Sequence, residues 1–193
     1  MARKKYEFRP DTPNHDILGK LLLTKKQSKT LLRWLLFSAV CVAGLILQDV
    51  VMSDVSIFGT TTDLVPCCIF TICVLQGAEG SCWFALIASM LYYFSGSAPG
   101  AYCVPLITFL AVFAAIFRQG YLRKGFSALL ICTAVAMLLY EGCTLGIEVF
   151  LKHTTWLRWE RFLGSALLTL VCVPILYPIL LSIGKIGGET WKE

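Results

Sequence analysis

Glu141 is the residue whose type and position most strongly suggest a specific role. It lies inside the apolar segment 126–151, where an ionised carboxylate costs about 2.5–3.5 kcal/mol to place at the centre of a bilayer. Thr144 and Glu148 follow on the same face of a helix. We expect this face to point into a helix bundle or towards a partner, because lipid chains offer a carboxyl group no hydrogen bond.

Two roles are open for Glu141. It either contacts a partner or a small ligand, or it anchors the bundle internally through hydrogen bonds. No Lys or Arg lies at a matching depth in the other apolar segments, so we expect the carboxyl group to be protonated or hydrogen-bonded to Tyr92, Tyr93 or Ser89. If the second role is correct, Glu141→Gln leaves folding and function largely intact.

Small residues spaced four positions apart occur in several apolar segments. Such pairs allow two helices to approach closely, either within one chain or between chains. They are common in membrane helices, so they indicate contact surfaces without specifying the partner. Three pairs have this spacing: Gly142/Gly146, Ala39/Ala43 and Ala111/Ala115.

The sequence contains no recognisable catalytic, cofactor-binding or metal-binding set. It lacks a Ser/His/Asp order, paired carboxylates at a working spacing and a glycine-rich phosphate loop. The nine cysteines include no CxxC pair, and the two histidines, His15 and His153, are far apart. We therefore expect a non-enzymatic protein without cofactor or metal, in which the cysteines pack as small polarizable side chains.

The elements that position these residues are predicted to be membrane-spanning helices. Of 193 residues, 57% are hydrophobic and 15% are charged, against about 45–50% and about 25% in soluble chains. This composition excludes a soluble enzyme, a disordered chain and a nucleic-acid-binding module. We predict an all-α membrane protein with six transmembrane helices, of which the second to fourth are short. Their ranges are 31–52, 64–76, 81–94, 105–117, 126–151 and 162–183.

Basic residues are distributed unevenly over the loops that six spans create. One side receives fourteen of the 17 Lys and Arg residues, and the other receives only Lys152, Arg158 and Arg161. Because basic loops remain in the cytoplasm, both termini are predicted to be cytoplasmic. A five-span alternative, in which the second and third spans merge, halves this asymmetry and is less favoured.

The predicted domain organisation has three parts. A basic cytoplasmic arm (1–30) precedes the six-helix transmembrane domain (31–184), and a short cytoplasmic tail (185–193) follows it. In the sixth span, Pro174 and Pro178 each remove a backbone hydrogen bond and predict a kink. The arm is either a solvated tail or an amphipathic helix on an anionic leaflet, the latter indicated by helical spacing of Ile17, Leu18, Leu21 and Leu22 among lysines.

The order of these features carries a family resemblance. Asp63-Leu64 opens the second span, a hairpin at 77–80 separates the second from the third, and residues 91–100 read LYYFSGSAPG. This stretch is similar to the Leu-Asp-x-x-Ser-Gly-Ser-x-x-Gly pattern of the rod-shape-determining MreD family, with Tyr92 in place of the usual Asp. The resemblance covers roughly residues 31 to 187, and the matching positions after Tyr92 are Ser95, Gly96, Ser97 and Gly100.

The resemblance implies a non-catalytic scaffold or regulatory subunit in the bacterial plasma membrane that helps to organise peptidoglycan synthesis during cell elongation. Its implied partners are an MreC-like bitopic protein, bound through membrane helices, and further a RodA-type glycosyltransferase, a penicillin-binding transpeptidase and MreB. The implied fold is similar to that of the substrate-binding subunits of energy-coupling-factor vitamin transporters.

Such a vitamin-transporter subunit is also the alternative function. The features that favour it are the Ala39/Ala43 pair, as a docking surface, and the loop from Ser95 to Pro105, as the lid of a pocket. Aromatic residues near the same span ends, including Tyr92 and Tyr93, either line such a pocket or form the ordinary interfacial belt. The candidate contact residues for either function are Glu141, Thr144, Glu148, Gly142, Gly146, Tyr92, Tyr93, Ser95, Gly96, Ser97, Gly100, Ala39 and Ala43.

Overall fold

The computed structural model describes residues 25–52, 62–122, 125–151 and 159–186, and over these residues the protein is all-helical. The helical segments overlap the six predicted apolar segments and extend beyond several of them, and the sixth is divided into two helices. The all-α prediction is therefore confirmed. The predicted helix in the basic arm lies outside the described residues. The elements are α2 (Lys25–Leu47), the π-helical η1 (Gln48–Met52), α3 (Leu64–Gln76), α4 (Ala78–Phe94), α5 (Cys103–Tyr121), α6 (Phe126–Phe150), α7 (Trp159–Leu170) and α8 (Val173–Gly184).

Three described helical segments are long and apolar enough to cross a membrane, namely Gln27–Val50, Cys103–Tyr121 and Phe126–Phe150. Phe162–Leu170 and Val173–Gly184 supply a fourth if the bent pair is one span. The protein is therefore a helical membrane protein. In contrast, α3 has only 13 residues, about 20 Å of helix, which is shorter than the roughly 30 Å hydrocarbon core.

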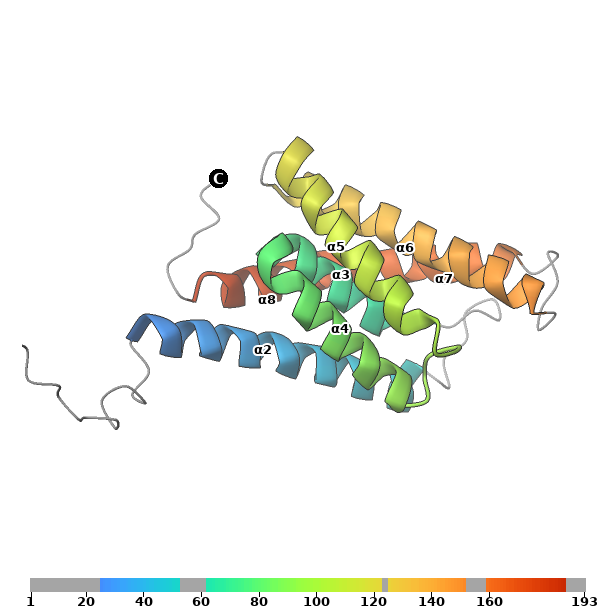
Figure 1. The fold of residues 1–193 in the computed structure, drawn as a ribbon, viewed down its shortest axis with the longest axis horizontal. Coiled ribbons are helices and arrows are strands. Elements are labelled where there is room, and N and C mark those ends of the chain that lie inside the picture. Colours follow the sequence, from blue (N-terminus) through green and yellow to red (C-terminus); the bar gives the residue numbers. More distant parts are fainter. Residues whose placement is uncertain (1–24, 53–61, 123–124, 152–158, 187–193) are drawn as a thin grey trace, which may run out of the picture.

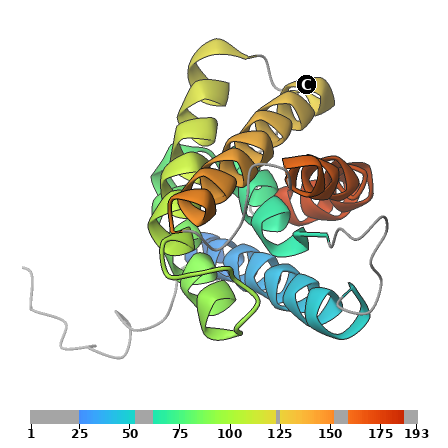
Figure 2. The same ribbon diagram turned by 90° about the vertical axis from the view of Figure 1, so that its right-hand side faces the viewer.

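The short helix α3 forms the core of the bundle. Every residue from Leu64 to Leu75 is buried, and α3 contacts α2, α4, α5, α6, α7 and α8. Figure 2, which looks at one end of the bundle, shows these helices arranged around it. A helix that is apolar on all sides is stable only where every side is covered by apolar surroundings. Here the cover is protein, which also shields the non-helical backbone at both ends of α3.

The surrounding helices form a ring in the order α2, α4, α5, α6 and the α7–α8 pair, which returns to α2. Their outward faces carry large apolar side chains such as Trp83, Phe109, Ile131 and Ile175. This is the arrangement expected of helices whose outer faces meet lipid. The ring is least tightly packed between α2 and α4, where there is a groove of about 380 Å³. The residues that line this groove include Trp34, Cys41, Gly80 and Trp83.

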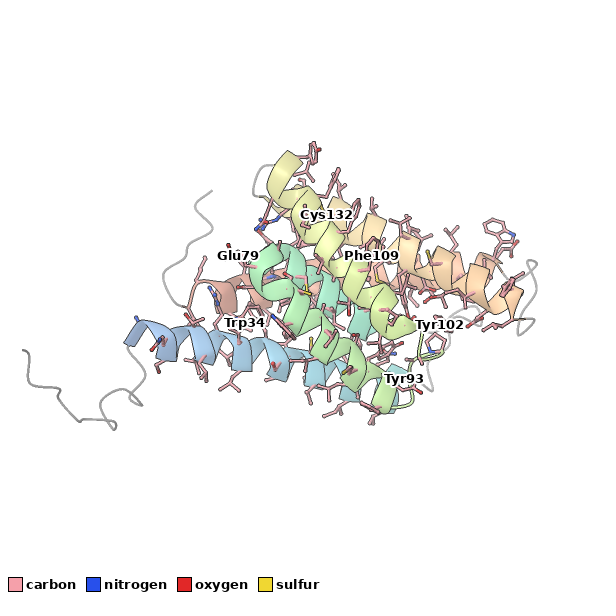
Figure 3. All side chains as sticks on the ribbon, viewed as in Figure 1. Trp34, Glu79, Tyr93, Tyr102, Phe109 and Cys132 are labelled. Atoms are coloured by element: carbon pink, nitrogen blue, oxygen red, sulfur yellow. The ribbon has the colours of Figure 1, made fainter. Side chains whose placement is uncertain are left out.

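Charged residues separate along the long axis of the bundle. The helical segments alternate in direction, so that α2 begins at the end where α8 finishes (Figure 1). We call the half of the bundle that contains the start of α2 and the end of α8 the basic end, and the opposite half the acidic end. Figure 3 shows Glu79 in the basic end, and Tyr93 and Tyr102 in the acidic end. The basic end carries Lys29, Arg33, Arg118 and Lys185 besides Glu79. The acidic end carries Asp49, Asp63, Glu141, Glu148 and Glu160.

The sixth apolar segment is bent, as its prolines predict. It divides into α7 and α8 with an angle of 48° between them. Pro174 lies at the start of α8, where the amide that it lacks has no helical acceptor to lose, and Pro178 lies inside α8. The break at Val171 and Cys172 therefore follows from the sequence.

The hairpin between α3 and α4 depends on a single glycine. Gly77 has φ +88° and ψ 178°, a conformation that is essentially restricted to glycine, and an added Cβ would overlap the side-chain amide of Gln119. We expect Gly77→Ala to reduce the free energy of unfolding by about 1–3 kcal/mol. Reversible unfolding in mixed micelles measures this effect. The control is Gly125→Ala, because Gly125 has φ −178° and open space around an added Cβ, and an equal loss in both variants would contradict the prediction.

Candidate functional site

Glu141 lies inside the bundle, where it joins α6 to α7 and to the start of α3. It is buried, and the Ser165 hydroxyl donates a hydrogen bond of 3.1 Å to its Oε1. Its carboxyl group also interacts with the carboxyl group of Asp63. We call Asp63 and Glu141 the carboxyl pair.

Backbone and hydroxyl groups fix the position of Asp63. Its amide donates to Thr169 Oγ1 at 3.0 Å, and the Thr169 hydroxyl in turn donates to the carbonyl of Ser165 at 2.7 Å. Two residues further on, the amide of Val65 donates to Gln48 Oε1 at 3.0 Å. These bonds occupy amides that the first turn of α3 leaves without helical acceptors.

Two buried hydroxyl groups next to the carboxyl pair in the sequence lack hydrogen-bond partners among the described residues. They belong to Thr62, which precedes Asp63, and to Thr144, one turn beyond Glu141 on the same face of α6. Both side chains are at least 95% buried. Buried polar groups usually have partners, so this concentration of free oxygen atoms is notable.

The chemistry available at the carboxyl pair is proton exchange and the binding of cations. The Ser165 hydroxyl donates to Glu141 and the Thr169 hydroxyl accepts from the Asp63 amide, and neither is hydrogen-bonded to a described His or Lys that would activate a nucleophile. Within the described part of the chain, no three His, Cys, Asp or Glu side chains are close enough together to hold a metal ion. All nine cysteines are free, and six of them are buried.

The serine loop, Ser95 to Gly100, is a separate structure at the acidic end. Ser95 Oγ donates to the carbonyl of Tyr92 at 2.8 Å and lies 2.9 Å from Ser97 Oγ, whose hydroxyl donates to Asp49 in η1. Gly96 has φ +83°, which favours glycine. At Gly100 an added Cβ would meet the Tyr102 ring. The loop is thus connected by hydrogen bonds to η1, which follows α2, and its two serines form these hydrogen bonds.

The small-residue pairs have different environments. Ala111 and Ala115 are buried inside the bundle. Ala39 and Ala43 are exposed on α2, and an added Cβ at Gly142 or Gly146 would meet no atom within 4 Å. Internal packing therefore uses the first of these pairs and leaves the other two on the outward surface.

The structure corrects two expectations about Glu141 and Tyr92. The hydrogen-bond partner of Glu141 is Ser165, not Tyr92, Tyr93 or Ser89. Ser89 instead donates to the carbonyl of Leu86 on its own helix. The Tyr92 side chain is fully buried and therefore is not part of an interfacial belt, whereas Tyr93 is exposed.

The predicted contact residues thus fall into three groups: the interior around Glu141 and Thr144, the serine loop, and the exposed small-residue pairs. Glu148 is half-buried and lies close to the hydroxyl of Tyr102. Sequence reasoning did not assign Asp63, Ser165 and Thr169 to the site. Each lies in or beside the part of its apolar segment nearest the acidic end. Comparing the depth of each residue in the membrane with that of Glu141 would have identified them.

No protein-family model, no curated protein and no solved structure matches this chain.

Proposed function

We propose that this protein is a non-catalytic membrane scaffold, similar in role to MreD proteins, that binds a bitopic MreC-like partner through its outward helix faces. In this proposal it belongs to the cell-elongation complex of the bacterial plasma membrane and helps to organise peptidoglycan synthesis. A RodA-type glycosyltransferase, a penicillin-binding transpeptidase and MreB are its further partners. The proposal rests on the sequence resemblance and on one structural observation, the open Gly142/Gly146 pair.

The open pair favours a helix partner for a physical reason. Association of membrane helices depends on close packing, because lipid chains are as apolar as the side chains that they would replace. Glycines four apart allow the backbone of a second helix to approach closely, and this stripe of α6 has no neighbour among the described residues. The opposite face of α6 carries Glu141 and Thr144 and is buried in the bundle. The outward stripe is therefore available to a partner helix.

We further propose six membrane crossings, with both termini in the cytoplasm. The alternating direction of the helices and the position of α2 and α8 at one end support an even number. Lys29, Arg118 and Lys185 at the basic end support a cytoplasmic location for that end. In this proposal the short helix α3 and the polar residues at its two ends, Asp63 and Gln76, together form one crossing, which is enclosed by the other helices.

Co-expression with the MreC-like protein of the same genome tests the proposed function. We expect the wild-type chain to recover this partner in detergent, and Gly142→Leu combined with Gly146→Leu to reduce the recovery about tenfold, equivalent to a loss of about 1.4 kcal/mol in binding. The matched control is Gly120→Leu, because Gly120 on α5 also has open space around an added Cβ. Failure of the wild-type chain to recover the partner contradicts the scaffold role, and full recovery by the double variant contradicts the assigned surface.

A substrate-binding subunit of a vitamin transporter is the second candidate. The buried, incompletely hydrogen-bonded hydroxyl groups around the carboxyl pair favour it, since a small polar ligand would supply the missing partners. Mass spectrometry of the purified protein distinguishes the two functions. A stoichiometric vitamin would support the transporter subunit, and an MreC-like protein without such a ligand would support the scaffold.

A further inference from the structure

The groove between α2 and α4 opens on the outward surface of the bundle. Trp34, Ser38 and Cys41 of α2 line one side, and residues of α4 between Gly80 and Leu91 line the other. Apart from the Ser38 hydroxyl, the lining side chains carry aromatic, aliphatic or thiol groups. Its volume of about 380 Å³ lies within the range of about 300–1,000 Å³ that is usual for small-molecule sites. The groove is therefore suited to an apolar ligand.

Close packing fixes the wall of the groove. The half-buried indole of Trp34 lies against Gly80, where an added Cβ would overlap the ring, and its ring centroid is 5.6 Å from that of Phe84. On the rim of the groove, Trp83 is 72% exposed and Ile87 is 57% exposed. The groove thus has a preformed wall and a rim of large apolar side chains.

The position of the groove along α2 places it at the depth of the lipid chains. Trp34 and Cys41 both lie inside the apolar segment Gln27–Val50, whose 24 residues are long enough to cross a membrane. A helix of this length extends about 36 Å, more than the roughly 30 Å of the hydrocarbon core. A ligand in the groove is therefore surrounded by hydrocarbon and has to be apolar over the length of the groove.

The dimensions of the groove favour a single hydrocarbon chain over a helix. From Gly80 to Leu91 the groove follows α4 for about 16 Å, so a volume of about 380 Å³ corresponds to a cross-section of about 24 Å². This is the width of one extended acyl chain. A helix about 10 Å across would occupy about 1,250 Å³ over the same length, and it would lie on the groove without entering it.

The distribution of charge indicates which lipid supplies the chain. Among the described side chains, the basic end carries Lys29, Arg33, Arg118 and Lys185 against Glu79, whereas the acidic end carries five acids. An anionic headgroup is attracted to the first end and repelled by the second. On α2, Lys29 lies about 8 Å further towards the basic end than Trp34, at the depth of the headgroups.

We propose that the groove between α2 and α4 binds one acyl chain of an anionic phospholipid, whose headgroup lies at the basic end. The chain extends along α2 and α4 from the level of Trp34 and Gly80 to that of Leu91. It fills the least tightly packed part of the ring with close contacts that a loosely ordered lipid does not provide.

Native mass spectrometry of the full chain in mild detergent tests this site. We expect one phosphatidylglycerol per chain, retained about fivefold more than a phosphatidylcholine with the same acyl chains. Ser38→Phe places a ring in the groove and should reduce retention about tenfold. The matched control is Ala39→Phe, because Ala39 is the next residue on α2, is exposed, and does not line the groove.

Fluorescence gives a second readout that does not depend on a variant of the groove. In a chain that keeps Trp34 as its sole tryptophan, with the other four replaced by phenylalanine, phosphatidylglycerol with brominated acyl chains should quench the emission. The same lipid without bromine should leave the emission unchanged. In this background Ser38→Phe should remove most of the quenching in detergent, and Ala39→Phe should preserve it.

Four results would overturn the proposal. They are no retained lipid on the wild-type chain, equal retention of the two lipids, equal retention by Ser38→Phe and Ala39→Phe, and unquenched Trp34. Displacement of the lipid by an MreC-like protein would assign the groove to a partner helix instead. These results do not depend on Gly142 and Gly146, so the lipid site and the proposed partner surface are tested separately.

Discussion

Replacing Phe70 by alanine is expected to lower the free energy of unfolding by roughly 2–4 kcal/mol. Phe70 lies in α3, is fully buried, and packs edge-to-face against Tyr140 of α6 with ring centroids 6.3 Å apart. Its removal leaves a cavity in the middle of the bundle. The expected cost is below the upper values for water-soluble cores, because an unfolded chain in detergent keeps its side chains in apolar surroundings. What is lost is mainly close packing, which lipid cannot restore inside the ring of helices.

Steric-trap or denaturant unfolding in mixed micelles measures this effect, and Phe109→Ala is the matched control. Phe109 is 69% exposed on the outward face of α5, where it stacks on Phe113 at 6.3 Å. Lipid or detergent can fill the space left by this truncation, so we expect a loss below about 1 kcal/mol. Equal losses in the two variants would show that α3 is not the enclosed core of the bundle.

Replacing Glu141 has an expected effect that depends on the new side chain. Leucine has a similar volume but removes the acceptor of the Ser165 hydroxyl and the partner of Asp63. Two partly buried polar groups then lack partners, and we expect a loss of about 1–3 kcal/mol. Glutamine preserves both contacts, since its side-chain carbonyl oxygen accepts from Ser165 and its amide donates to the Asp63 carboxyl group. For Glu141→Gln we expect a change within about 1 kcal/mol.

A double-mutant cycle with Asp63 separates the pair interaction from the rest of the effect. If the two carboxyl groups interact directly, Asp63→Leu added to Glu141→Leu costs less than the two single losses together, with a coupling of about 0.5–3 kcal/mol. Additive losses would mean that the two carboxyl groups act independently. Glu160→Leu at an exposed position of α7 should change stability little and serves as the control.

Several features of the site were accessible from the sequence because they depend on local chemistry. Glu141 stood out since a carboxyl group in an apolar helix is costly wherever that helix packs. The break in the last segment followed from Pro174 and Pro178, and the reversal at Gly77 followed from the glycines of the hairpin. The partners of Glu141 were not accessible in this way. Asp63 and Ser165 are distant from it in the chain, and only the packing of α3 and α7 against α6 brings them together.

The sequence by itself determined that the chain is a set of apolar helices, roughly where they lie, and that the basic residues are distributed unevenly over the segments between them. These properties depend on the composition of continuous segments. The tertiary structure alone decided that α3 is enclosed by protein whereas the outer faces of α2, α5 and α6 are not. Hydropathy does not distinguish these cases, because the interior of a membrane protein and the surrounding lipid are both apolar. The tertiary structure also decided that Ala111 and Ala115 pack internally while Gly142 and Gly146 remain open. The sequence could not show this difference, because the residues of both pairs are four positions apart.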